Sequence, residues 1–172
     1  MLLPLLEIGA ILALAVYLFR WRAGLRRRNE QSWDSILARL QTDWSARELS
    51  DHFLWAEKLK STPEETWVCI KGPKGLWAMH RNARVMMEMA DYAARNSDTV
   101  DPLLLNTLRI DAIHIRLFAL MALAQYPFSA AGQRVRLNAF RAASMYTLMA
   151  ARMMQLLQEN APGIVPDFVA AM

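Results

Sequence analysis

The sequence contains a single cysteine, Cys69, among its 172 residues. One thiol cannot form an internal disulfide, a zinc site made only of thiolates, or an iron–sulfur cluster held by cysteines. Internal repeats and low-complexity runs are also absent, and no catalytic or cofactor-binding motif stands out. We therefore predict a chain with no cofactor and no catalytic residues, whose function must be inferred from the placement of apolar and charged residues.

No segment has the spacing of a phosphate-binding loop or of a complete metal site. Residues 71–75 (KGPKG) lack the GxxxxGK(S/T) spacing and a preceding strand, so we interpret them as a solvated turn. Asp111 and His114 have the three-residue spacing of half a helical di-iron site, which needs a second such unit. Because the sequence has no second unit, we interpret the two residues as a local charge pair.

Acidic residues are missing between positions 112 and 158, a stretch that carries five arginines. The predicted basic surface combines three of these with three arginines near the N-terminus: Arg26, Arg27, Arg28, Arg134, Arg136 and Arg141. Anionic lipid headgroups are the partner expected first, since each arginine near a charged membrane contributes about 1 kcal/mol. An acidic face of a membrane complex is the second interpretation. Nucleic acid is not expected, because no recognition motif accompanies the arginines.

The one long apolar run covers residues 2–19, with Glu7 as its only ionisable side chain. Its length just exceeds the roughly 17 residues that a membrane-spanning helix needs. Positive charge follows the run instead of preceding it, which favours an uncleaved anchor over a signal peptide. Basic residues stay on the cytoplasmic side. Residues 1–28 are therefore predicted to anchor the chain in the plasma (inner) membrane, with the N-terminus outside and the rest in the cytoplasm.

Four residues of this anchor are candidates for contact with the membrane or with a partner helix. Gly9 and Ala13 form a small-xxx-small pair that lets two helices approach closely. Glu7 either reaches the outer interface or makes a polar contact to a partner helix. Trp21 is expected at the level of the lipid headgroups.

The sequence after the anchor predicts an all-α fold, in which residues 29–160 form a bundle of about five helices. Two short helices are expected between 29 and 56, and further helices over 62–70, 76–96, 102–126 and 129–158. Thr62 with Glu65 forms a capping box, and Asp101 caps the helix that begins at Pro102. Arg84–Glu88 and Asp91–Arg95 are predicted ion pairs.

Residues 117–131 carry no charge but are too short for a second membrane span. A buried helical hairpin is the preferred interpretation, and insertion into the membrane interface is the alternative. In the last helix Leu137, Phe140, Ser144, Leu148 and Ala151 share one face. The methionines that cluster in the helices predicted at 76–96 and 129–158 are interpreted as core filling rather than as an adaptable groove. The tail, 161–172, is expected to be flexible.

These patterns predict a membrane-anchored accessory or assembly subunit that docks protein partners, and not an enzyme. Trp33, Trp55 and Phe168 are candidate partner contacts, because exposed aromatic residues are enriched where proteins bind one another. The alternative is a membrane-tethered helical domain that binds a lipid or a small apolar ligand, with enzymatic activity left open. A cavity in which His80, Asp111 and His114 converge would favour that alternative. Self-association into a homo-oligomer is also left open.

Overall fold

The computed structural model describes residues 32–41, 62–97, 99–129 and 132–171, and every regular element in these ranges is helical. The elements are α2 (Trp33–Leu37), α4 (Pro63–Cys69), α5 (Pro73–Asn96), α6 (Pro102–Ser129), α7 (Gln133–Asn160), the 3₁₀ helix η1 (Pro162–Ile164) and α8 (Val165–Ala171). The prediction of an all-α chain is confirmed for these residues.

The described helices include none with the length and hydropathy needed to cross a membrane. The predicted anchor, residues 2–19, lies outside the described residues and stays a prediction. The chain divides into two units, residues 1–35 and 36–172. In the first unit the structure describes 32–35, where Ser32 Oγ accepts a hydrogen bond from the Ser35 N–H (3.3 Å) and caps the start of α2.

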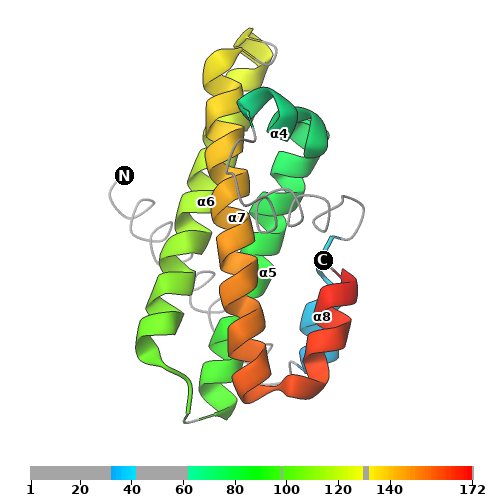
Figure 1. Cartoon of the computed structure of the whole chain (residues 1–172), viewed down its shortest axis with the longest axis vertical. Coiled ribbons are helices and arrows are strands. Elements are labelled where there is room, and N and C mark those ends of the chain that lie inside the picture. Colours follow the sequence, from blue (N-terminus) through cyan, green and yellow to red (C-terminus); the bar gives the residue numbers. More distant parts are fainter. Residues whose placement is uncertain (1–31, 42–61, 98, 130–131, 172) are drawn as a thin grey trace, which may run out of the picture. The chain divides into compact units, whose positions relative to one another are not determined.

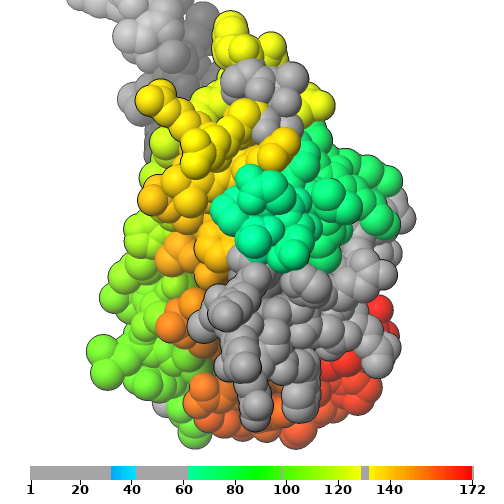
Figure 2. Space-filling model, turned by 45° about the horizontal axis from the view of Figure 1, so that its top comes forward, coloured from blue at the N-terminus to red at the C-terminus, as the bar shows by residue number. Residues whose placement is uncertain are grey.

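The second unit is built on three long helices, α5, α6 and α7, which run side by side (Figure 1). Short connections, 97–101 and 130–132, make neighbouring helices antiparallel. Figure 2 shows α4, in teal, against the yellow-orange start of α7, and η1 and α8 pack on the other end of α7. The described part of the bundle therefore consists of three long helices with short helices attached to them.

Alanine is the most frequent residue in the described core of this bundle, followed by leucine and methionine. Fully buried alanines include Ala112 and Ala119 on α6 and Ala139 and Ala142 on α7. Small side chains let these helices pack closely, and larger residues fill the spaces between their contact points. Met79, Met86, Met89, Met149 and Met153 are also fully buried. The interpretation of the methionines as core filling is confirmed for these five.

Two helix starts lie where the capping residues predicted them. The Thr62 Oγ1 accepts a hydrogen bond from the Glu65 N–H (3.2 Å), and Glu65 Oε2 accepts one from the Thr62 N–H (2.9 Å). Before α6, Asp101 Oδ1 accepts a hydrogen bond from the Leu103 N–H (2.9 Å). In each case a side-chain oxygen satisfies a backbone donor that the first turn of the helix leaves free.

In the segment 71–75 the predicted solvated turn is confirmed for Lys71 and Lys74, which are exposed, whereas Gly72 and Gly75 are buried. Gly72 has a φ of 61°, and α5 begins directly after it at Pro73. Gly75 is buried inside the first turn of α5, where an added Cβ would lie 1.8 Å from the Ile70 carbonyl oxygen. Both glycines are needed for the tight approach of α4 to α5.

Three other boundaries or faces differ from the prediction. α6 continues to Ser129 through Pro127, because a proline in the last turn removes only one backbone hydrogen bond. α7 begins at Gln133 and packs through its small residues, so the predicted face leaves Leu137 and Leu148 exposed. The tail is not flexible chain: it forms η1 and α8, and Phe168 is fully buried.

Asn82 connects three parts of the bundle through its buried amide. Its Oδ1 accepts a hydrogen bond from the Gln41 N–H (2.8 Å), and its Nδ2 donates to the Gln41 carbonyl oxygen (3.2 Å). The same Nδ2 lies 3.2 Å from the Tyr146 hydroxyl oxygen on α7. Burial raises the pKa of that hydroxyl, so Tyr146 stays protonated. This network fastens residues 36–41 to α5 and α7.

Candidate functional site

The outward side of α6 is apolar over most of its length. We call this surface the α6 outer face, defined by seven exposed residues: Leu103, Ile110, Ile113, Leu117, Leu120, Met121 and Phe128. The side chain of Phe128 is 91% exposed. The interpretation of 117–131 as a buried hairpin is therefore wrong for this side of α6, because only its inward side packs on α5 and α7.

The α6 outer face follows a heptad spacing, the pattern of helices that pack along a seam. Leu103, Ile110, Leu117 and Ala124 are seven residues apart, and Ile113 and Leu120 lie between them at the second position of the repeat. Asn106 takes the one polar place in that second series. At 1.5 Å per residue the row is about 30 Å long. A row of this spacing and length fits a second helix laid along α6.

Two carboxylates on or next to α6 each form an ion pair with an arginine. Asp111 is buried and pairs with Arg152 of α7, while Asp91 of α5 pairs with Arg109 (2.8 Å) instead of with Arg95 as predicted. The predicted pair of Arg84 with Glu88 is present, at 3.2 Å.

Arg134 and Arg141 are exposed and pair with no carboxylate among the described residues. The Arg141 guanidinium lies 5.7 Å from the centre of the Phe118 ring on α6. Arg136 is different, because its guanidinium lies 3.4 Å from Glu64 of α4. Two of the three predicted basic residues of α7 are therefore exposed and have no carboxylate partner within the described ranges, whereas Arg26, Arg27 and Arg28 lie outside those ranges.

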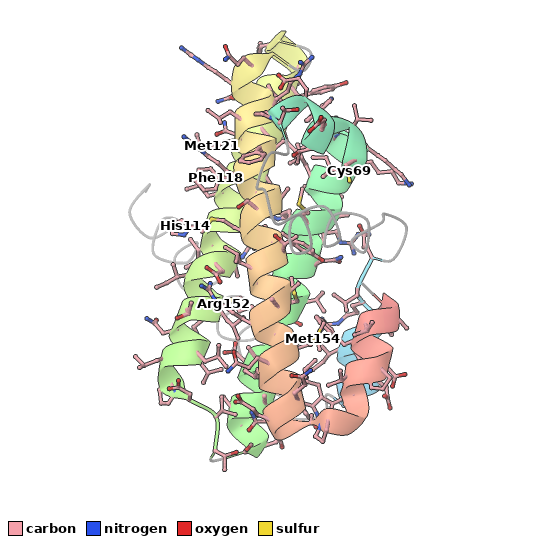
Figure 3. The ribbon with its side chains drawn as sticks, in the orientation of Figure 1. Cys69, His114, Phe118, Met121, Arg152 and Met154 are labelled. Atoms are coloured by element: carbon pink, nitrogen blue, oxygen red, sulfur yellow. The ribbon has the colours of Figure 1, made fainter. Side chains whose placement is uncertain are left out.

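The predicted Asp111–His114 charge pair is not formed, because Asp111 binds Arg152 across the α6–α7 contact. His114 stacks on Phe118 instead, with ring centres 6.3 Å apart. Figure 3 shows His114, Phe118 and Met121 in succession along α6. The described residues contain no group of three His, Cys, Asp or Glu side chains that could hold a metal ion.

A second feature is a cleft of about 760 Å³ lined by residues 38–41, α5 and α6. We call it the arginine cleft, because Arg39, Arg81, Arg84 and Arg116 line it with Glu88 as the one acidic residue among its described lining. Trp77 and His80 form one wall, stacked with ring centres 5.4 Å apart. Neither Asp111 nor His114 lines it among the described residues, so the three-residue convergence that would favour an apolar-ligand site is absent.

His80 remains neutral in the arginine cleft at pH 7. Burial lowers its pKa below the ordinary value of 6.5, and the positive charges of Arg116 and Arg84 lower it further. A hydrogen bond to the main chain of Arg116 acts in the opposite direction. The side chain of His80 is half-buried and lines the cleft.

The remaining candidate contacts divide into three groups. Trp33 is half-buried on α2. Phe168 is fully buried and packs inside the domain, so it is not available to a partner. Trp55 lies outside the described residues, as do the four anchor candidates Glu7, Gly9, Ala13 and Trp21.

Sequence reasoning missed both the α6 outer face and the arginine cleft. The heptad from 103 to 124 was a readable signal for the first, because it repeats every seven residues. On α5, Trp77, His80, Arg81, Arg84 and Glu88 recur at helical spacing, which indicates one shared face. Arg39 and Arg116 come from distant parts of the chain and could not be assigned to that face. Comparison with family models, curated proteins and solved structures finds no match.

Proposed function

We propose that this chain is a single-pass membrane-anchored accessory or assembly subunit, which docks a protein partner of a membrane complex. The α6 outer face is the observation that carries the proposal. Contiguous apolar surface is unusual on the outside of a domain and typical of a site that another molecule covers. Here it forms a row about 30 Å long with heptad spacing, which favours a helix as the covering element.

The surroundings of the α6 outer face favour an acidic partner helix. Arg134 and Arg141 are exposed on the neighbouring helix α7, and the chain has no acidic residue between 112 and 158. A helix with an apolar row and flanking carboxylates complements both the row and the charge. Asn106 would fix the register of that helix, as single polar residues do in coiled coils.

The anchor, residues 2–19, brings the helical domain to the same membrane as its partner. In the proposed topology the N-terminus lies outside and the domain lies in the cytoplasm, since the arginines follow the apolar run. Tethering two partners to one membrane makes the second contact effectively intramolecular, so a modest interface suffices. The chain itself needs no catalytic group for this role.

The test compares two double variants of the full-length tagged protein, extracted from its own membranes in mild detergent. Ile113→Glu/Leu117→Glu places charge in the α6 outer face. Val68→Glu/Val169→Glu is the matched control, because both valines are exposed on α4 and α8. Native mass spectrometry of the wild type is expected to show a stoichiometric protein partner. The partner should be lost from the first variant and retained by the control.

Three outcomes would count against this function. A wild-type chain that carries no partner would remove the subunit role. A homodimer broken by Ile113→Glu/Leu117→Glu would assign the α6 outer face to a second copy of this chain. Equal loss of the partner in both variants would show that added charge, and not this face, is responsible. Circular dichroism checks that all three proteins keep the same helix content.

A further inference from the structure

The arginine cleft concentrates positive charge in a way that the docking of a partner helix does not explain. Four guanidinium groups and one carboxylate line a hollow of about 760 Å³, which leaves a formal charge of +3. They come from residues 38–41, α5 and α6, so the bundle itself holds them together. A concave surface of one sign focuses the electrostatic potential and attracts ions of the opposite sign.

The one carboxylate is already engaged. Glu88 Oε1 lies 3.2 Å from Arg84 Nε, and Glu88 Oε2 accepts a hydrogen bond from Arg39. Arg81 and Arg116 pair with no carboxylate among the described residues. Two cations therefore remain to be compensated by a ligand or by solvent.

Two buried nitrogen atoms of residues that line the cleft have no hydrogen-bond partner within the described part of the chain. Arg116 Nε is a donor, and His80 Nδ1 can donate or accept in a neutral ring. Leaving a buried donor unsatisfied is unfavourable, and more so when the donor is charged. A ligand oxygen in the arginine cleft could accept from Arg116 Nε and remove that cost.

We propose that the arginine cleft binds a phosphate group, either free or as the headgroup of an anionic phospholipid. Guanidinium groups present paired N–H donors that match phosphate oxygens, and several of them together favour a doubly charged anion over a carboxylate. The cleft is larger than a phosphate ion, so the rest of an organic phosphate also fits. The stacked Trp77 and His80 rings provide a wall for that part.

The test uses the full-length protein in mild detergent and two probes of the same chemistry. Inorganic phosphate is titrated by calorimetry, with sodium chloride holding the ionic strength constant. Vesicles of phosphatidylcholine, with and without phosphatidic acid, are used for flotation. Arg81→Gln/Arg116→Gln removes the two uncompensated cations of the arginine cleft. Lys71→Gln/Lys74→Gln removes the same charge from two exposed positions outside the arginine cleft and is the matched control.

The cleft variant is expected to bind at least about tenfold more weakly, and the control less than about threefold. If the cleft variant loses binding of inorganic phosphate, the ligand is a free phosphate. If it loses only the binding of phosphatidic acid vesicles, the ligand is a lipid headgroup. No binding of either probe by the wild type, or equal weakening in both variants, would overturn the proposal. The single variant Arg81→Gln, at an exposed position, keeps the test valid if the double variant does not fold.

Discussion

Helices α5 and α6 are neighbours that both place one side in the core, but their outward sides differ in chemistry. The outward side of α5 is charged and carries Arg81, Arg84, Glu88, Asp91 and Arg95. Contact with water costs these charged groups no free energy. The α6 outer face instead leaves apolar side chains in contact with solvent at a cost of about 25 cal/mol per Å².

This difference separates two roles that hydrophobic residues play in one domain. The inward apolar residues of α5 and α6 hold the bundle together, since they are removed from water within the chain. The outward residues of α6 gain that free energy only when another molecule covers them. A helix with apolar side chains on its outward side as well as its inward side therefore agrees with the proposed docking of a partner.

The largest expected effect tests this separation with two isoleucines of α6. Ile115 is fully buried, whereas Ile113, two residues away, is 60% exposed. Ile115→Ala should lower the free energy of unfolding by about 2–5 kcal/mol, through lost burial and the cavity left behind. Ile113→Ala should change it by no more than about 0.5 kcal/mol. Urea unfolding of the full-length protein in detergent, followed by circular dichroism, measures both.

Similar losses for the two isoleucine variants would break the comparison, because the α6 outer face would then be packed within the chain itself. A second experiment repeats the comparison with the proposed partner present. Ile113→Ala should weaken binding of the partner, although it leaves the stability of the free protein unchanged. Ile115→Ala serves as the reference for a purely internal residue.

A smaller effect is expected from the ion pairs that join α6 to its two neighbours. Arg152→Ala leaves the buried Asp111 carboxylate without its partner and should cost about 2 kcal/mol. Arg109→Ala breaks a pair with Asp91 that stays in contact with water, and should cost less than about 1 kcal/mol. Raising the salt concentration should weaken the second pair more than the first. Equal costs in the same urea experiment would contradict this ranking.

How far the sequence predicts the fold can be followed along these two helices. Asp101 and the Thr62–Glu65 box located helix starts, because capping needs only residues three positions apart. The wide apolar stripe of α5 predicted its burial, since the polar residues left a single outward side. On α6 the same reasoning failed, because apolar residues occur on both the inward and the outward side and do not tell which side packs. On α7 the sequence placed Leu137 and Leu148 on one face but did not tell whether that face packs, and the structure leaves both exposed.

The candidate sites were less predictable than the fold. The α6 outer face depends on exposure, which a local sequence pattern does not determine. The arginine cleft depends on Arg39 and Arg116, which are far apart in the sequence and meet only after folding. Phe168 was predicted to be an exposed contact in a flexible tail, because the tail follows Pro162 and Gly163. The structure instead buries its ring on α8.

The smallest expected effect concerns His80, on the charged side of the comparison. Below pH 6.5 the unfolded chain binds a proton at His80. In the folded protein the lowered pKa keeps the His80 side chain neutral. The contribution of His80 to stability is therefore complete above pH 6.5 and is lost as the pH falls through the lower pKa of the folded state. The charged residues facing it in the cleft are Arg39, Arg81, Arg84, Glu88 and Arg116.

The measurement follows the thermal unfolding midpoint of the wild type and of His80→Gln between pH 7.5 and pH 5. The midpoint of the wild type should fall more steeply below pH 6.5, because glutamine does not titrate and cannot add a proton to a cationic cleft. Other titrating groups are common to both proteins and cancel in the difference. Parallel curves would mean that His80 is as easily protonated in the folded protein as in the unfolded chain. Arg116 would then exert no effective repulsion on it, and the positive potential assigned to the arginine cleft would be screened by solvent.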